Sequence, residues 1–165
     1  MRCPIALLIL TLFSLSAAAD TLEGRVVGLA DGDTVTVLDE QKTQHKIRLA
    51  GIDAPEKGQA YGNVSKQSLS DLVYDKTVSV DWHKVDRYGR KVGKILIDGL
   101  DANLEQVKRG LSWHYKEYAK EQSSEDQARY ADAETQARLD KRGLWNEPEP
   151  IPPWAWRKMK RETQH

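Results

Sequence analysis

Three features of the sequence predict an α+β fold, a five-stranded OB-fold-type Greek-key β-barrel with three α-helices. First, three strand-like segments, residues 22–29, 34–38 and 45–49, follow one another with short links, which is typical of an antiparallel meander. Second, one helical segment separates them from two more strand-like segments, residues 77–82 and 92–97. Third, the other helical patterns come last, which gives the order β-β-β-α-β-β-α-α of an OB-type barrel. A parallel doubly wound sheet would need crossover helices between the early strands, and the links there are too short.

Turn signals separate the first three strands. Gly24 and Gly28 are candidate positions for a β-bulge in the first strand. Asp31-Gly32-Asp33 is a turn sequence, and the β-branched run that follows it favours a strand. The short polar segment 39–43 fits a hairpin loop that returns the chain into the third strand. These links place the first three strands side by side.

Three segments have the periodicity of helices, residues 64–74, 103–109 and 125–142. Gly110 and Gly143 follow the second and third segments, and glycine is a common helix stop. The faces that we expect to be buried contain Leu69, Leu72 and Val73 in the first helix, Leu104 and Val107 in the second, and Ala128, Ala131 (with Tyr130 beside it), Ala137 and Leu139 in the third.

The first 19 residues have the pattern of a secretory signal peptide. Arg2 supplies a positive charge, residues 5–15 form a short apolar run, and residues 16–19 are Ser-Ala-Ala-Ala. The apolar run is too short to anchor the chain in a bilayer. We therefore expect cleavage after Ala19 and a periplasmic or secreted protein with no membrane segment. The only cysteine, Cys3, would be lost with the signal peptide, so the mature chain would have no disulfide.

The remaining chain is long enough for one domain, which we expect over residues 20–147. A tail follows over residues 148–165, with prolines first, then Trp154 and Trp156, then the basic run 157–161. Two interpretations of this tail are open. Its tryptophans pack on the domain and leave the basic end loose, or the tail binds nucleic acid by stacking and charge.

The overall charge does not indicate a nucleic-acid-binding protein. The chain has 25 Lys and Arg and 25 Asp and Glu residues, and loss of Arg2 leaves a net charge of about −1. Binding to a polyanion would therefore have to come from a local patch. The histidines show no zinc-ligand spacing and are expected to be surface or packing residues.

Three groups that suit phosphodiester chemistry lie in the ten residues 47–56. Arg48 is on a predicted strand, and Asp53 and Glu56 lie in the turn that follows Gly51. A guanidinium is a planar, permanently charged fork that fits phosphate oxygens. A carboxylate binds a hard cation such as Ca²⁺ or takes a proton from water. The stretch therefore contains a phosphate-binding cation, a metal ligand and a base.

Two further charged segments, DGDTV at 31–35 and DRYGR at 86–90, lie at predicted turns, and a meander can bring such strand ends to one rim of a barrel. With these segments included, the sequence resembles the staphylococcal nuclease (thermonuclease) family, a group of Ca²⁺-dependent nucleases with an OB fold. The resemblance extends from about residue 24 to residue 156. It rests on the motifs DGDTV at 31–35, IRLAGIDAPE at 47–56, DRYGR at 86–90, VKRGLSW at 107–113 and RGLW at 142–145.

The resemblance implies a role for each matching residue. Asp33 and Asp53 would provide side-chain oxygens to Ca²⁺, and Ala54 its backbone carbonyl. Glu56 would activate the attacking water. Arg48 and Arg90 would bind the phosphate and stabilise the transition state. The family cleaves the bond to the 5′ oxygen of DNA or RNA and leaves 3′-phosphate ends, so DNA and RNA are the expected substrates.

The residues that would bind the nucleotide are less sharply defined by the resemblance. Tyr88 and Arg87 lie within the DRYGR match, and Tyr115 and Tyr118 are candidates for stacking on a base. Ordinary surface or core packing is the alternative for these four residues. No obligate protein partner is implied, and we expect a monomer.

Three other interpretations remain open at this point. The charged residues could form a buried salt-bridge network. Asp31-Gly32-Asp33-Thr34-Val35 also fits a motif of haloacid-dehalogenase-like phosphatases, but those enzymes need a parallel sheet and would leave Arg48 and Glu56 unexplained. Finally, the chain could be a non-catalytic OB-fold module that binds nucleic acid.

Overall fold

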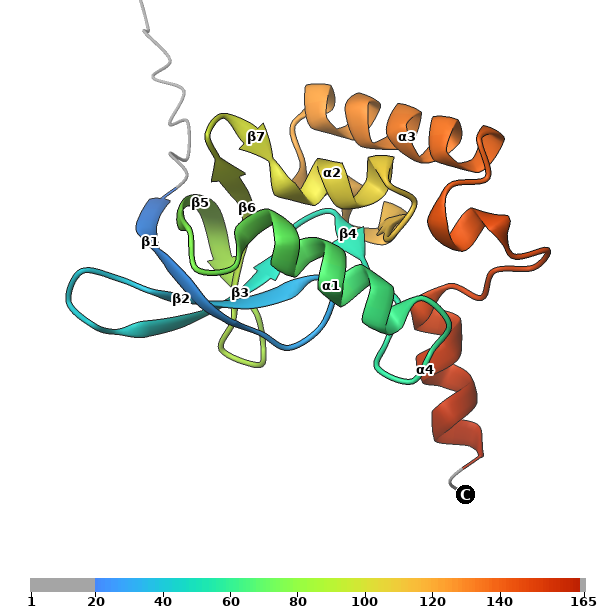
Figure 1. Ribbon diagram of the computed structural model, residues 1–165, viewed down its shortest axis with the longest axis horizontal. Helices are drawn as coiled ribbons and strands as arrows, with labels where there is room; N and C mark the ends of the chain where they lie inside the picture. The colour runs from blue at the N-terminus through green and yellow to red at the C-terminus, as the bar shows by residue number, and fades with distance from the viewer. Residues whose placement is uncertain (1–19, 164–165) are drawn as a thin grey trace, which may run out of the picture.

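Five strands close into a barrel at the N-terminal side of the molecule (Figure 1). In the computed structural model, which describes residues 20–163, these strands pair in the order β3-β2-β1-β5-β6, and a parallel pairing of β3 with β6 closes the barrel. The predicted barrel is therefore confirmed. The expected signal peptide, residues 1–19, lies outside the described residues. The strands are β1 (Asp20–Leu29), β2 (Thr34–Leu38), β3 (Gln44–Leu49), β5 (Thr77–Val85) and β6 (Lys91–Ile97).

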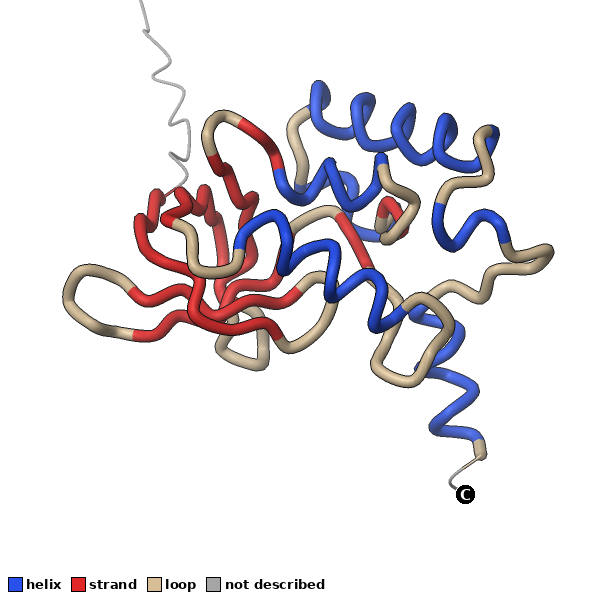
Figure 2. Tube along the Cα trace, viewed as in Figure 1, coloured by secondary structure: helices blue, strands red, loops and turns tan. Residues whose placement is uncertain are grey.

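The helices lie on one side of the barrel, as Figure 2 shows by separating strands from helices. α2 (Ala102–Lys108) packs between α1 (Gly62–Val73) and α3 (Ser124–Leu139) (Figure 1). Two short strands, β4 (Ile52–Asp53) and β8 (Trp113–His114), pair with each other outside the barrel. The remaining elements are β7 (Leu100–Asp101), the 3₁₀ turns η1 (Lys116–Glu121) and η2 (Gly143–Asn146), and α4 (Pro153–Glu162).

The main core fills the barrel and continues under the helices. Alternate residues of the strands point inward, as the period of a half-buried strand requires, and the apolar residues predicted for α1 and α2 are buried against them. A second, smaller cluster joins β8 to the C-terminal part of the chain and contains Trp113, Ala137, Leu144 and Trp145. Because β8 pairs with β4, this cluster holds the C-terminal part of the chain close to the short strand that follows Gly51.

The face that α3 buries matches the predicted one only in part, because Tyr130 and Ala137 are buried as expected but two other residues are not. Ala128 is exposed, and Leu139 is 70% exposed. The helix also ends at Leu139, earlier than expected. The residues that α3 buries are Asp126, Tyr130, Glu134 and Ala137.

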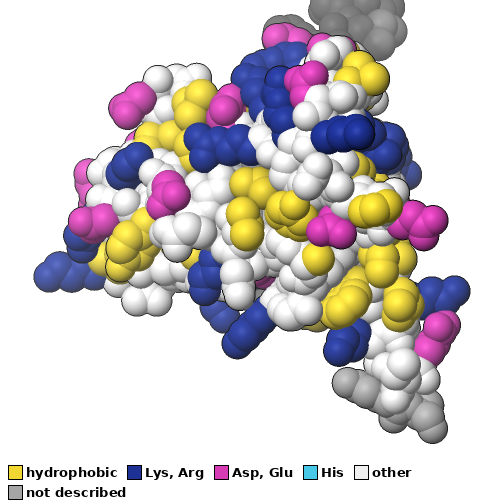
Figure 3. All heavy atoms as spheres, turned by 45° about the vertical axis from the view of Figure 1, so that its right-hand side comes forward, with side chains coloured by type: hydrophobic (Ala, Val, Ile, Leu, Met, Phe, Trp, Pro, Cys, Tyr) yellow, Lys and Arg dark blue, Asp and Glu magenta, His cyan; other side chains and the backbone are white. Residues whose placement is uncertain are grey.

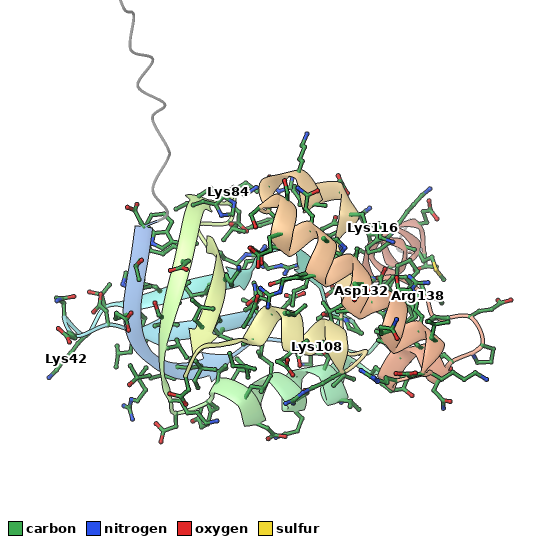
Figure 4. All side chains as sticks on the ribbon, turned by 90° about the horizontal axis from the view of Figure 1, so that it is seen from above. Lys42, Lys84, Lys108, Lys116, Asp132 and Arg138 are labelled. Atoms are coloured by element: carbon green, nitrogen blue, oxygen red, sulfur yellow. The ribbon has the colours of Figure 1, made fainter. Side chains whose placement is uncertain are left out.

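Ion pairs explain why two carboxylates can lie on the buried face of α3. Glu134 is 3% exposed, accepts a hydrogen bond from the His114 N–H, and pairs with Lys116 and Arg138, both labelled in Figure 4. Asp126 pairs with Lys94 of β6. A search for apolar positions misses such a face, since a buried charge is tolerated when it is paired.

The tail forms a fourth α-helix, in addition to the three that the sequence predicted. Pro153 occupies the first turn of α4, where a missing backbone N–H costs nothing. α4 projects from the body at the lower right of Figure 1 and leads to the C-terminus. None of the helices within residues 20–163 has the length and apolar character of a membrane span.

Candidate active site

A cleft of about 610 Å³ lies at the rim of the barrel between β3, β5, β6 and α4. Every residue that the sequence predicted for the site lines it. These residues are Asp33, Arg48, Asp53, Ala54, Glu56, Arg87, Tyr88, Arg90, Tyr115 and Tyr118. The structure therefore brings together the three motifs that are separated in the sequence.

Asp33 lies at the turn between β1 and β2. Its backbone N–H donates to the side chain of Asp31 (3.1 Å), so Asp31 supports the turn as expected. The Asp33 carboxylate is buried, and it accepts hydrogen bonds from the Ala54 N–H (2.6 Å) and the Thr34 hydroxyl (3.1 Å). These contacts fix the Asp33 carboxylate against the segment that carries the other acidic residues.

Asp53 is positioned by the short β4–β8 pairing. Gly51 has a φ of +72°, which glycine adopts without strain, and it turns the chain out of β3 into β4. The Gly51 carbonyl then accepts a hydrogen bond from the Tyr115 N–H (2.9 Å), and Asp53 pairs with Trp113. The Asp53 side chain is only 1% exposed. The turn at Gly51 thus directs a buried carboxylate toward Asp33.

Arg48 joins the two acidic residues. Its Nη2 lies 2.9 Å from Asp53 Oδ1 and 3.2 Å from Asp33 Oδ2. Its Nη1 donates to the backbone carbonyls of Leu49 and Ile52, each at 2.9 Å. The guanidinium is therefore held from both the barrel and the turn, and one face of it borders the cleft.

Arg90 enters the cleft from the turn between β5 and β6. Asp86 accepts hydrogen bonds from its Nε (2.8 Å) and from its backbone N–H (3.0 Å), and Asp86 Oδ2 lies 2.7 Å from its Nη2. Burial alone would raise the pKa of Asp86, but the hydrogen bonds from Arg90 and Tyr88 outweigh it, so that the pKa lies below its usual value. An ionised Asp86 therefore orients the Arg90 guanidinium.

The aromatic candidates line two edges of the cleft. Tyr88 is 67% exposed, and the guanidinium carbons of Arg87 and Arg90 lie 5.0 and 5.4 Å from its ring centroid. Tyr115 and Tyr118 contact each other edge to face at 5.0 Å. Tyr88 is thus a largely exposed aromatic residue with two cations over its ring.

A buried carboxylate at this site is difficult to ionise without a cation. Burial raises the pKa of Asp33 to about 7, and the charges of Asp31 and Asp53 act in the same direction, while Arg48 and the Ala54 N–H oppose them. Additional positive charge near Asp33 would therefore stabilise its ionised form.

The groups around Asp33 suit a hard divalent cation. Within residues 20–163, no three His, Cys, Asp or Glu side chains are grouped as a metal site. The donors at hand are the carboxylates of Asp33 and Asp53 and the backbone carbonyl of Ala54, and all are oxygen atoms. Ca²⁺ accepts such ligands in irregular geometry and completes its coordination with water. The residues present are compatible with Ca²⁺.

Sequence reasoning did not identify Arg157 of α4, a charged residue that lines the cleft. Its Nη1 lies 2.6 Å from Glu56 Oε1, and its Nη2 lies 2.8 Å from Asp53 Oδ2. Burial lowers the pKa of Arg157, but the hydrogen bonds and charges of Asp53 and Glu56 outweigh this effect. The pKa of Arg157 therefore lies above its ordinary, already high value. The spacing of Trp154 and Arg157, three residues apart after a proline pair, could have indicated a helix that presents both side chains on one face.

Comparison with known proteins places the chain among nucleases. The model of the family described as "Staphylococcal nuclease homologue" matches residues 46–147. A protein of Escherichia coli O157:H7 named uncharacterized endonuclease is 40% identical over 154 residues, which cover 93% of this chain and 96% of that protein. A protein of Shigella flexneri named micrococcal nuclease is 36% identical over 168 residues, which cover 96% of this chain and 93% of that protein.

Proposed function

The chain belongs to the staphylococcal nuclease family and is a hydrolase of phosphodiester bonds, and from this premise we propose that it is an exported, Ca²⁺-dependent nuclease that degrades both DNA and RNA. We propose further that it shows no sugar specificity and leaves 3′-phosphate ends.

One observation carries this proposal. A single nitrogen of Arg48 lies within 3.2 Å of carboxylate oxygens from both Asp33 and Asp53, residues that are 20 positions apart in the sequence. Glu56 and Arg90 line the same cleft. A phosphate in the cleft would therefore meet a cation-binding carboxylate pair, a base and two guanidinium groups.

The roles of the residues follow from their chemistry. Glu56 takes a proton from a water molecule, and the resulting hydroxide attacks phosphorus. The bond to the 5′ oxygen breaks, and this oxygen leaves and takes up a proton, so the products are a 3′-phosphate and a 5′-hydroxyl. Arg48 and Arg90 stabilise the negative charge that builds on the phosphoryl oxygens. Asp33, Asp53 and the Ala54 carbonyl would hold Ca²⁺, which would supply Lewis-acid stabilisation of the same charge.

Tyr88 and Arg87 account for substrate binding without sequence preference. The exposed Tyr88 ring can stack on any base, because every base has a π-face. Arg87 adds a phosphate contact, and Tyr115 and Tyr118 extend the aromatic wall on the other side of the cleft. None of these contacts reads a base edge, which supports action on both DNA and RNA.

Export and assembly complete the proposal. The signal-peptide pattern in residues 1–19 supports a periplasmic or secreted protein. We expect it to act as a monomer, since the proposed residues all come from one chain. The phosphatase alternative is excluded, because β1, β2 and β3 are antiparallel neighbours and not parts of a parallel sheet.

Digestion of plasmid DNA and of purified RNA tests the function directly. We expect loss of both substrates in Ca²⁺ and none after addition of a Ca²⁺ chelator, with 3′-phosphate ends on the products. A preparation of Glu56→Gln made in the same way controls for contaminating nucleases. Digestion that proceeds unchanged in chelator would contradict the metal requirement, and digestion of DNA alone would contradict the lack of sugar specificity.

A further inference from the structure

The C-terminal helix inserts a positive charge into the acidic part of the cleft. Arg157 Nη2 lies 2.8 Å from Asp53 Oδ2, its Nη1 lies 3.2 Å from Asp53 Oδ1, and the same Nη1 lies 2.6 Å from Glu56 Oε1. With Arg48 on Asp53 Oδ1, both oxygens of the Asp53 carboxylate have a guanidinium partner. Charge-assisted hydrogen bonds of this kind are among the strongest in proteins.

These contacts use the atoms that the proposed reaction needs. Asp53 is assigned to the divalent cation, and Glu56 is assigned to the proton of the attacking water. A divalent cation and a guanidinium repel each other, and they compete for the same oxygens. The hydrogen bond from Arg157 also occupies a Glu56 oxygen that would otherwise face the water molecule.

Arg157 is held differently from Arg48 and Arg90, the two arginines assigned to the phosphate. Arg48 donates to two backbone carbonyls, and Arg90 is oriented by Asp86, which the reaction does not use. The hydrogen bonds of the Arg157 guanidinium go to Asp53 and Glu56. Its position therefore depends on the two carboxylates whose occupancy would change when a cation binds.

Few other contacts attach α4 to the body. Trp154 stacks on Tyr115, with ring centroids 5.4 Å apart and ring planes 5° apart, and contacts Trp113 edge to face at 5.5 Å. Gln59 donates to the Ile151 carbonyl (2.6 Å) just before the helix. After Arg157 the helix projects into solvent and carries basic side chains (Figure 3). An element with so few buried contacts can detach without unfolding the domain.

We propose that α4 is a tethered stopper of the active site, in which the Arg157 guanidinium binds Asp53, one of the proposed cation ligands, together with Glu56, and is displaced with the helix when a divalent cation binds. The inference rests on the proposed function, because it assumes a cation at Asp53. Displacement would also uncover Tyr115, one of the candidates for base stacking, since Trp154 lies on its ring. The cleft would thus open for metal and nucleotide in one movement.

Calorimetric titration with Ca²⁺ tests the competition without relying on catalysis. The chelator-treated protein is compared with Arg157→Ala, with Trp154→Ala, and with Lys158→Ala as a control on the exposed side of the same helix. If the closed form makes up about 90% of the molecules, its loss should tighten the apparent Kd about tenfold. We expect this gain in Arg157→Ala, a smaller one in Trp154→Ala, and none in Lys158→Ala.

Limited proteolysis provides the conformational readout. Trypsin should cleave after Lys158 and Lys160 faster in the presence of Ca²⁺ than in its absence, and in Arg157→Ala this cleavage should be fast in both conditions. An unchanged or weaker Ca²⁺ affinity of Arg157→Ala, with normal binding by the parent protein, would overturn the stopper and leave the proposed function intact.

Two other outcomes would also reject the inference. A lower nuclease rate of Arg157→Ala at saturating Ca²⁺, with no change in Ca²⁺ affinity, would assign Arg157 to the substrate phosphate. If neither protein binds Ca²⁺, the proposed metal requirement fails, and the stopper fails with it because it has no cation to exclude.

Discussion

The Tyr130 hydroxyl of α3 lies 2.9 and 3.0 Å from the two carboxylate oxygens of Asp101. Asp101 is also the N-cap of α2, because its Oδ1 accepts a hydrogen bond from the Leu104 N–H (2.9 Å). Burial raises the pKa of Asp101, and the hydroxyl and the N–H that donate to it act against this rise. One buried carboxylate thus joins the start of one helix to the middle of another, and neither Asp101 nor Tyr130 lines the cleft.

Replacing Tyr130 by Phe should lower stability and leave catalysis unchanged. The change removes the hydroxyl and leaves Asp101 with one fewer donor, which should cost about 1–2 kcal/mol. Chemical denaturation measures the loss, and nuclease assays at a temperature where the variant is folded should give the parent rate. A free energy of unfolding equal to that of the parent would show that water replaces the hydroxyl without cost.

Substitution of Arg48 should lower both stability and activity, whereas substitution of Arg90 should lower mainly activity. Arg48→Ala leaves the buried carboxylates of Asp33 and Asp53 without their shared partner, so we expect a loss of about 3–5 kcal/mol as well as loss of activity. Arg90 pairs with Asp86 nearer the surface, so Arg90→Ala should lower the nuclease rate by about 10²–10³ with a stability loss under about 1 kcal/mol.

Thermal unfolding and nuclease assays on the two variants test this separation. Lys42, at the tip of the β2–β3 hairpin and far from the helices (Figure 4), provides a neutral control as Lys42→Ala. Full activity of folded Arg90→Ala, together with full activity of folded Glu56→Ala, would show that the assigned mechanism is wrong.

The barrel and the location of the cleft were predictable because both depend on local patterns. Alternation of apolar residues gave the five strands, and turn residues gave the strand ends where Asp33 and Arg90 lie. The ends of neighbouring strands in a closed barrel lie near one another, so three charged motifs at such ends come together at one rim. The resemblance to a known family then assigned roles that composition alone could not.

The elements that were missed depend on tertiary contacts. The buried face of α3 contains Asp126 and Glu134, which are acceptable there only because partners such as Lys94 and Lys116 come from other elements. The position of Arg157 could not be predicted for the same reason. It belongs to the basic run 157–161, and nothing in that run indicates that Arg157 pairs with Asp53. Local sequence patterns do not indicate an ion-pair partner that is 104 positions away, as Asp53 is from Arg157.

Glu56→Gln should abolish most activity without disturbing the fold. The amide keeps the size of the side chain but cannot accept a proton from water, so the rate should fall by about 10²–10⁴. Because the Glu56 side chain is 34% exposed, thermal stability should change little. Rates and unfolding midpoints are measured on the same preparation. A rate within a factor of about two of the parent would assign the base to another group.

The raised pKa of Asp33 predicts how the metal-free protein responds to pH. Its value of about 7 in the folded state exceeds the ordinary 3.8 expected for the unfolded chain, so the folded state holds this proton more tightly. The stabilising contribution is complete below about pH 4 and is lost as pH rises through about 7. In chelator, the parent protein should therefore lose stability relative to Asp33→Asn over this interval, because the variant carries no proton to release. Urea unfolding of both proteins at several pH values gives the difference.

Addition of Ca²⁺ at pH 7.5 should stabilise the parent and not the variant, since a ligand that binds the folded state stabilises it. A stability difference that stays constant from pH 4 to pH 8 would show that Asp33 is ionised throughout and that Arg48 alone compensates its burial.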